Sequence, residues 1–198
     1  MKVVLASNNA GKLKEFQELF SVSSVTLQPQ AELGVPDIEE TGLSFVENAL
    51  LKARNAAKCT GLPAIADDSG LCVDYLKGEP GIYSARYAGT HGDRDANVAK
   101  LHKKMLNVDK VDRKSRFVCV LAFIRFELDP MPIIVQGAWE GEIAQELQGI
   151  GGFGYDPLFL IPSLGCTAAE LDDNAKNKLS HRAQAMEQLM MQLRGELC

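Results

Sequence analysis

Short apolar runs alternate with segments of helical periodicity through the first third of the chain. An unbroken apolar run predicts a buried strand, whereas apolar residues spaced three and four apart predict one face of a helix. The polar stretches between them are rich in Ser, Asn, Asp and Gly, which are typical of turns. These patterns predict strands at 3–6, 25–27 and 62–66, the last of which ends in Asp67-Asp68-Ser69-Gly70, helices at 12–20 and about 44–58, and a short strand or edge at 71–76.

The rest of the chain contains more strand signals and fewer helical ones. Strands that alternate with helices and then follow one another predict an α/β fold with a mixed sheet flanked by helices. The strand-rich segment at about 115–147 could form a second lobe, and a cleft between two lobes is a natural ligand site. The predicted elements are helices at 93–106 and 180–197, strands at 116–127 and 133–139, a short strand after 141, a glycine-rich loop at 149–157 and a last strand at 157–161.

Composition and charge narrow the classes of function. The chain has 198 residues, of which 46% are hydrophobic and 24% charged, as expected for one soluble globular domain over residues 1–198. Its net charge of −5 argues against a nucleic-acid partner, which needs a basic face. The five cysteines form no C-x-x-C motif, and no apolar run approaches the ~20 residues of a membrane span. We therefore expect a cytoplasmic protein that binds no membrane.

The first candidate site is the stretch Ser7-Asn8-Asn9-Ala10-Gly11-Lys12, between a predicted strand and a predicted helix. A helix N-terminus has free backbone N–H groups and a partial positive charge, so it is suited to phosphate, and Lys12 adds a full charge. Because the helix dipole disfavours a cation at this end, the lysine calls for an anion. The stretch is not a Walker A loop, since Ala6 replaces its first glycine. The alternative is a helix cap from Asn8 or Asn9 beside a solvated lysine.

Carboxylates are the second candidate feature. Asp67 and Asp68 follow a predicted apolar strand, where they would suit Mg²⁺ or could orient or deprotonate a water molecule; the alternative is an ordinary turn. Glu39 and Glu40 precede a predicted helix, where they could add ligands to the same metal or only stabilise the helix end. Lys52 lies at the margin of that helix's apolar stripe, from which its amine could reach a cleft or extend into water.

A glycine-rich loop and the start of the last helix form the third candidate feature. Phe153 and Tyr155 could stack on a planar base while Asp156 reads its edge; the alternative is a structured turn with core aromatics. His181 and Arg182 could donate hydrogen bonds to a base carbonyl or a phosphate, although such residues are also ordinary at a helix start.

Taken together, the motifs closely resemble the inosine triphosphate pyrophosphatase family, whose members hydrolyse non-canonical purine nucleoside triphosphates. The match runs through nearly the whole chain in the same order, and the bacterial dITP/XTP branch fits best. The stretch before the first helix reads Ser-Asn-Asn where many relatives have Thr-Gly-Asn, which keeps the hydroxyl and the second asparagine. The matching motifs are residues 7–12, 39–42, 47–54, 66–71, 80–87, 152–157 and 180–182.

The resemblance implies an elongated α/β fold in which two lobes surround a central substrate cleft, usually as a homodimer. It also implies Mg²⁺-dependent hydrolysis of a nucleoside triphosphate to a monophosphate and pyrophosphate. Motif by motif, it implies phosphate binding by Ser7, Asn8, Asn9, Ala10, Gly11, Lys12 and Lys52, a general base or metal ligand at Asp68, a metal site completed by Glu39 or Glu40, substrate contact by Ser69, and base binding by Phe153, Gly154, Tyr155, Asp156, Lys176, His181 and Arg182.

Two other functions are weighed against this one. A Maf-type nucleotide pyrophosphatase would prefer modified pyrimidines, and the loop and helix-start motifs of the third feature argue against it. A non-catalytic nucleotide sensor would bind without turnover, and the retained aspartates and lysines argue against that. Inosine and xanthosine have a carbonyl at C6 where adenosine has an amino group, so donors such as His181 or Arg182 would favour the first two.

Overall fold

The computed structural model of the chain describes residues 1–20 and 25–196. The chain divides into two compact units, each built from segments that are separate in the sequence. Unit 1 contains residues 1–68, 119–137 and 183–198, and unit 2 contains residues 69–118 and 138–182. The strand-rich segment at about 115–147 thus contributes to both units. The single domain over residues 1–198 and the cleft between two lobes stay predictions.

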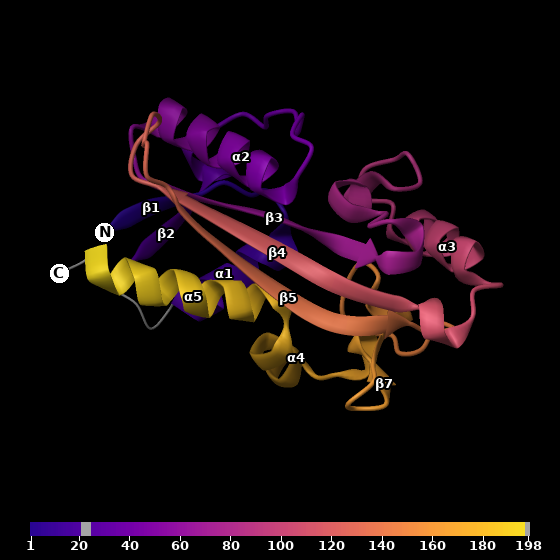
Figure 1. The fold of residues 1–198 in the computed structure, drawn as a ribbon. Coiled ribbons are helices and arrows are strands. Elements are labelled where there is room, and N and C mark those ends of the chain that lie inside the picture. The colour runs from indigo at the N-terminus through magenta and orange to yellow at the C-terminus, as the bar shows by residue number, and fades with distance from the viewer. Residues whose placement is uncertain (21–24, 197–198) are drawn as a thin grey trace. The chain divides into compact units, whose positions relative to one another are not determined.

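The strands in the described residues form one mixed sheet of seven, in the order β2-β1-β3-β4-β5-β6-β7 (Figure 1). Strand β1 pairs in parallel with β2 and β3, whereas β6 pairs antiparallel with β5 and β7. The predicted α/β class with a mixed sheet and flanking helices is confirmed. No helix in the described part of the chain is long and apolar enough to cross a membrane. The strands are β1 (Lys2–Leu5), β2 (Thr26–Pro29), β3 (Ala64–Val73), β4 (Lys114–Ile124), β5 (Ile133–Ile143), β6 (Phe159–Ile161) and β7 (Cys166–Thr167), and the helices are α1 (Ala10–Phe20), α2 (Phe45–Thr60), α3 (Arg94–Met105), α4 (Asp173–Leu179) and α5 (His181–Glu196).

Unit 1 is layered, with α2 on one face of its strands and α1 and α5 on the other (Figure 1). The period-two alternation of a strand sends Val3 and Leu5 of β1 into the core that includes α1 and α5. Helix α2 begins at the predicted cap, where the side chain of Ser44 accepts a hydrogen bond from the backbone N–H of Glu47. Small buried side chains let α2 approach the strands closely, and these are Ala49, Ala53, Ala56 and Ala57.

Unit 2 has a core of aromatic and long aliphatic side chains. Phe117 of β4 packs against Phe159 of β6 with ring centroids 4.5 Å apart, and Trp139 of β5 packs against the same ring at 5.3 Å. Leu101 and Met105 of α3 belong to the same cluster. Helix α3 thus packs on this aromatic group through one face.

The strand predicted at 62–66 does not end at 67–70, and the alternative of an ordinary turn there is wrong. Strand β3 continues through these residues, and Asp67, Asp68 and Gly70 are buried within it. Aspartate and glycine favour turns in isolation, but β3 is hydrogen-bonded to its neighbour β4 in the sheet, and this pairing keeps it extended beyond the residues that pair with β1. Of the short strand predicted at 71–76, residues 71–73 form the end of β3, and Asp74–Leu76 form a 3-10 helix instead.

Other differences concern short elements and boundaries. No separate strand follows Gly141, because β5 runs through it to Ile143. A Cβ atom at Gly141 would lie 2.5 Å from the ring of Phe159, so only glycine fits there. Strand β7 and helix α4 were not predicted, since neither is long enough to show a hydrophobic period. Helix α1 begins at Ala10, two residues before its predicted start.

Candidate active site

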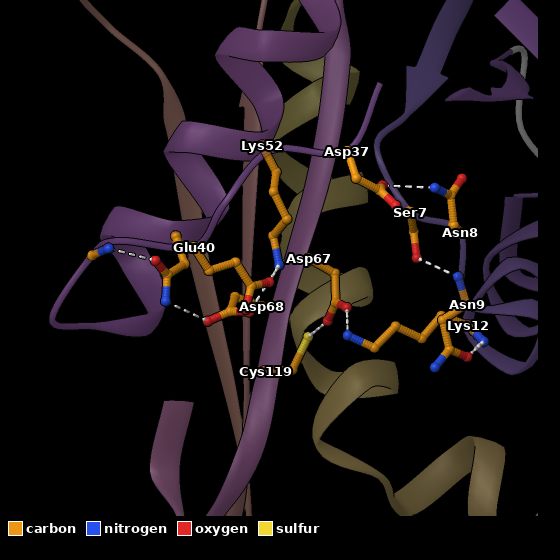
Figure 2. A network of polar contacts seen from close by, with 12 residues as sticks. Ser7, Asn8, Asn9, Lys12, Asp37, Glu40, Lys52, Asp67, Asp68 and Cys119 are labelled. Atoms are coloured by element: carbon orange, nitrogen blue, oxygen red, sulfur yellow. Dashed lines mark hydrogen bonds and ion pairs between the residues drawn. The ribbon is translucent and has the colours of Figure 1, made fainter. Parts of the chain in front are cut away.

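The continuous course of β3 sets the directions of its two acidic side chains. Successive side chains on a strand point to opposite faces of the sheet, and Figure 2 shows Asp67 and Asp68 pointing apart. Both residues are buried, with 2% and 5% exposure. The two carboxylates therefore lie in different clusters, one beside α1 and one beside α2, and not in the single pair that a turn would present.

Asp68 lies on the α2 face of the strand. Its Oδ1 accepts a hydrogen bond from Lys52 Nζ at 2.8 Å, and the same amine donates to Glu40 Oε1 at 2.7 Å (Figure 2). Its other oxygen, Oδ2, accepts from Asn48 Nδ2 at 3.4 Å. Lys52 and Asn48 are four residues apart on α2 and so share one face of the helix. Extension of the Lys52 amine into water, one of the two predicted alternatives, is therefore wrong.

Burial and neighbouring charges together set the pKa values of Asp68 and Lys52. Burial raises the pKa of the Asp68 carboxyl to about 6, although the neighbouring Lys52 favours the charged form. Repulsion from Glu40 and Asp67 acts in the same direction as burial. Burial also disfavours the charged amine of Lys52, but the three carboxylates outweigh it and raise the pKa of Lys52 above its usual value. When Asp68 is ionised it is thus a buried anion, and Lys52 alone does not fully offset its negative charge.

Asp67 lies on the opposite face, beside α1. It forms an ion pair with Lys12, and its Oδ2 accepts a hydrogen bond from the Sγ–H of Cys119 on β4 at 3.3 Å (Figure 2). The anion expected beside Lys12 is therefore supplied by the protein itself, as the fully buried carboxylate of Asp67. The Lys12 side chain is only 17% exposed, so the alternative of a solvated lysine is wrong.

The stretch before α1 is ordered by its own side chains. Asn9 caps the helix, since its Oδ1 accepts from the backbone N–H of Lys12 at 3.1 Å, and Ser7 Oγ accepts from the Asn9 N–H at 3.3 Å (Figure 2). Asn8 Nδ2 donates to Asp37 Oδ1 at 2.6 Å, which ties the stretch to the loop before α2. The cap predicted as an alternative is confirmed for Asn9, while phosphate binding at this helix end stays a prediction. The exposed residues of the stretch are Asn8, Asn9 and Gly11, and Ala10 is the first residue of α1.

Unit 2 brings together four of the residues predicted to bind the base. Lys176 Nζ donates to Asp156 Oδ2 at 2.6 Å, and the same oxygen accepts from the backbone N–H of Phe153 at 2.7 Å. The ring centroid of Phe153 lies 4.3 Å from Lys176 Nζ and 4.8 Å from the guanidinium carbon of Arg182. Phe153 is 37% exposed, whereas the three charged residues are buried. A buried ionic group therefore holds an exposed aromatic ring.

The remaining residues of the glycine-rich loop have structural contacts. Tyr155 is buried, and its hydroxyl donates to the Ser84 carbonyl at 2.8 Å. Of the two aromatic residues predicted to stack on a base, only Phe153 is therefore exposed in unit 2. The Gly154 carbonyl accepts from Arg94 Nε at 3.2 Å, which fixes the loop to the start of α3.

Three further predicted residues are placed as follows. His181 is buried, and its ring stacks on Phe117 with centroids 5.0 Å apart. Ser69 is half-buried on β3. Glu39 is exposed, whereas Glu40 joins the ion-pair cluster described above. The structure thus separates the two glutamates that the sequence could not tell apart.

The motifs that contain these clusters match a known family over almost the whole chain. The model of the Ham1 family matches residues 3–192. The chain belongs to the Ham1 family. The resemblance drawn from the motifs, including its bacterial dITP/XTP branch, is confirmed.

Similar proteins match this Ham1-family chain from end to end. A dITP/XTP pyrophosphatase of Thioalkalivibrio sulfidiphilus is 56% identical over 195 residues, which are 98% of this chain and 100% of that protein. A protein of the same name from Escherichia coli O157:H7 is 53% identical and covers 98% of both chains. The structure of a HAM1 protein from Coxiella burnetii has a TM-score of 0.93 and 51% identity, covering 98% of this chain and 99% of that one.

Three residues that hold the clusters of this Ham1-family chain were given no role from the sequence. Asn48 could have been found, because it precedes Lys52 by four residues and so shares its helix face. Asp37 lies in a loop, where no periodicity indicates its partner. Cys119 lies in an apolar strand, where a thiol is indistinguishable from any small buried side chain.

The oxygen atoms beside Lys52 fit a divalent cation such as Mg²⁺. This ion usually binds one or two protein carboxylates and fills its other positions with water and substrate phosphate. Glu40 and Asp68 supply two carboxylates that converge on one point, where the Lys52 ammonium provides positive charge. The described residues contain no group of three or more His, Cys, Asp or Glu suited to hold a metal by themselves. A cation bound jointly by two carboxylates and a phosphate is consistent with that donor set.

Proposed function

We propose that this chain hydrolyses non-canonical purine nucleoside triphosphates, such as dITP and XTP, to the nucleoside monophosphate and pyrophosphate. Two proteins named dITP/XTP pyrophosphatase, 56% and 53% identical over 98% of the chain, support this activity. The structural observation that supports it most directly is the convergence of Glu40 and Asp68 on the Lys52 amine, at 2.7 and 2.8 Å. A triphosphate needs such a combination of metal ligands and fixed positive charge.

Unit 1 supplies the groups that would neutralise the triphosphate. A triphosphate brings about four negative charges, which must be offset before a water molecule can approach phosphorus. Lys12 and Lys52 would bind phosphate oxygens together with the backbone N–H groups at the start of α1 and the hydroxyl of Ser7. Both amines are held by carboxylates, so they are oriented before the substrate arrives.

The same cluster would hold the metal and activate water. We assign Mg²⁺ to Glu40 and Asp68; when bound, it would neutralise phosphate charge and lower the pKa of coordinated water. Asp68 would accept the proton of the attacking water through its ionised carboxylate, as a general base requires. The water oxygen forms a bond to phosphorus, the anhydride bond between the α- and β-phosphates breaks, and pyrophosphate leaves.

Unit 2 supplies the groups that would select the base. The exposed ring of Phe153 is suited to stack on a purine. Arg182 lies at this ring, whereas His181 stacks on Phe117, so we assign recognition of the C6 carbonyl to Arg182. A buried donor aimed at a carbonyl favours hypoxanthine and xanthine and leaves the amino group of adenine unpaired. Lys176 and Asp156 would keep the ring in place.

Assembly and location are proposed from the family resemblance. We infer a homodimer in the cytoplasm that acts on free nucleotides, without a nucleic-acid or membrane partner. The net charge of −5 supports the absence of a nucleic-acid partner. Light scattering of the purified protein tests the dimer, because the chain mass is 21.6 kDa and a dimer has twice that mass.

A substrate panel tests the activity. Purified protein is given dITP, XTP, dATP, GTP, dTTP or UTP, with and without Mg²⁺, and pyrophosphate is resolved from phosphate. We expect pyrophosphate from dITP and XTP, only with Mg²⁺, and no stepwise release of phosphate. A preference for pyrimidine nucleotides would indicate a Maf-type enzyme instead. Binding of dITP without any turnover would indicate a nucleotide sensor.

A further inference from the structure

A buried amide links Asp68 to the loop that contains Glu40, the other carboxylate assigned to the metal. Asn48 of α2 has no exposed surface, and both ends of its side-chain amide are hydrogen-bonded. Its Oδ1 accepts from the backbone N–H of Gly42 at 2.8 Å, and its Nδ2 donates to Asp68 Oδ2 at 3.4 Å. We propose that Asn48 is a positioning residue that fixes the loop containing Glu40 against Asp68, an inference that rests on the proposed function of this site.

The contacts around these residues form a closed ring. Lys52 links Glu40 directly to Asp68, and Asn48 links Gly42, two residues after Glu40, to the same aspartate. The two links start four residues apart on one face of α2, so the helix fixes the spacing between them. The loop and the strand are therefore joined twice, through a charged side chain and through a neutral one.

The link through Lys52 and the link through Asn48 respond differently when a cation and a triphosphate bind in the proposed reaction. The Lys52 amine stands where Glu40 and Asp68 converge, so a cation competes with it for both oxygens and a phosphate competes for the amine itself. Lysine is also a flexible side chain with a long stem. The short amide of Asn48 takes no part in that competition. Asn48 therefore keeps the loop in place when Lys52 changes partners.

Gly42 is required for this arrangement because any side chain at this position would clash with α2. A Cβ atom at Gly42 would lie 2.6 Å from the Cβ of Glu47 and 2.7 Å from Asn48 Oδ1. The backbone N–H of the next residue, Leu43, donates to Glu47 Oε2 at 2.8 Å. Two successive N–H groups of the loop are thus bound by two successive side chains of α2. The loop that contains Glu40 has its conformation set by the first turn of the helix.

Asn97 of α3 provides a matched control. It is also buried, at 4% exposure, and its amide links a helix to a loop in the same way. Its Oδ1 accepts from the Ala88 N–H at 2.6 Å, and its Nδ2 donates to the Ala85 carbonyl at 3.2 Å. Asn97 lies in unit 2 and contacts none of the residues assigned to the metal or the phosphates. Replacing either asparagine removes two buried hydrogen bonds, but only Asn48 touches the proposed site.

Hydrogen–deuterium exchange of the intact protein, without metal or nucleotide, tests the positioning itself. Asn48→Ala removes the acceptor of the Gly42 N–H, so peptides that include residues 40–43 should exchange faster than in wild type. Asn48→Asp keeps an acceptor oxygen for the Gly42 N–H but places a second carboxylate against Asp68, so its exchange at 40–43 should lie between those of wild type and Asn48→Ala. Asn97→Ala should leave these peptides as in wild type. Unchanged exchange at 40–43 in folded Asn48→Ala would overturn the proposal.

Pyrophosphate release from dITP over a range of Mg²⁺ concentrations tests the consequence. Loss of a residue that orients metal ligands typically lowers metal affinity or activity about 10- to 100-fold. Asn48→Ala should therefore need more Mg²⁺ for half-maximal rate or show a lower kcat, while KM for dITP at saturating Mg²⁺ changes less than about threefold. Asn48→Asp should also lose turnover, because it lacks the donor to Asp68.

The controls separate this proposal from its alternatives. Asn97→Ala should keep its Mg²⁺ requirement and turnover, even if its melting temperature falls as far as that of Asn48→Ala. Equal loss of activity in both variants, or an effect of Asn48→Ala on KM alone, would overturn the proposal. If wild type releases no pyrophosphate from any nucleotide, the proposed function fails, and the exchange experiment still decides whether Asn48 positions the loop.

Discussion

The clusters of unit 1 and unit 2 satisfy their charges in different ways. In unit 1, carboxylates hold two lysine amines. A metal ion can replace the amine as the partner of a carboxylate, and a phosphate can replace the carboxylate as the partner of an amine. In unit 2, two cations lie at the ring of Phe153, and the buried Asp156 holds one of them together with the loop backbone. The first arrangement suits exchange of ionic partners, and the second suits a fixed platform. Variants in unit 1 should therefore affect all nucleoside triphosphates alike, whereas variants in unit 2 should change the preference between bases.

The largest effect is expected for Asp68→Asn. The change is nearly isosteric but removes the charge needed to bind a cation and to accept a proton, so kcat should fall about 10²- to 10⁴-fold for dITP and dATP alike. Steady-state kinetics with both nucleotides and a melting curve measure this. Asp67→Asn is the control on the opposite face of β3, and its loss should be smaller. An Asp68→Asn enzyme that keeps more than about a tenth of wild-type kcat would remove Asp68 from the central role.

The next effect is expected for Arg182→Ala, and it concerns selectivity. Removing a donor to the C6 carbonyl deletes about 1–3 kcal/mol of discrimination, so the ratio of kcat/KM between dITP and dATP should fall about 10- to 150-fold. The ratio is the measurement that decides, because loss of a phosphate contact would lower both values by the same factor. An unchanged ratio would assign Arg182 to phosphate binding or to structure.

The fold class could be predicted because its signals are local. An unbroken apolar run at residues 3–6 and a capping box at 44–47 specify a strand and a helix start without help from distant residues. The course of β3 could not be predicted in this way. Asp67-Asp68-Ser69-Gly70 favours a turn locally, and only pairing with strands far away in the sequence keeps it extended.

The sequence motifs select residues for the candidate site, but they do not say which of these residues contact one another. The motifs identified Lys12, Lys52 and Asp68, and the structure places all three in ion pairs. Which carboxylate each lysine meets depends on the alternation of side chains along β3, and a strand predicted to end before Asp67 concealed that alternation. Cys119 gave no signal at all, since its role depends on which strand lies beside Asp67.

A smaller effect on catalysis is expected for Lys12→Ala. We expect kcat/KM to fall about tenfold for dITP and dATP alike, because one phosphate contact is lost from unit 1. Stability should also fall, since removing one partner of a buried ion pair leaves Asp67 uncompensated. The double variant Lys12→Ala/Asp67→Asn should recover much of the lost melting temperature without recovering kcat/KM. Absence of that recovery would mean that the stability loss does not come from the ion pair.

The smallest effect is expected in the pH dependence of stability without metal. Burial raises the pKa of Asp68 from 3.8 to about 6 in the folded protein, so between these values the folded state binds more protons than the unfolded state. The free energy of unfolding should then fall as pH rises through this window and gain no further change from Asp68 above it. The Asp68→Asn variant has no ionisable group at position 68, and all of its other titrating groups are the same as in wild type. The melting temperature of the variant minus that of wild type should therefore increase between about pH 4 and pH 7, and a difference that stays constant would show that the folded protein does not disfavour the charged carboxylate.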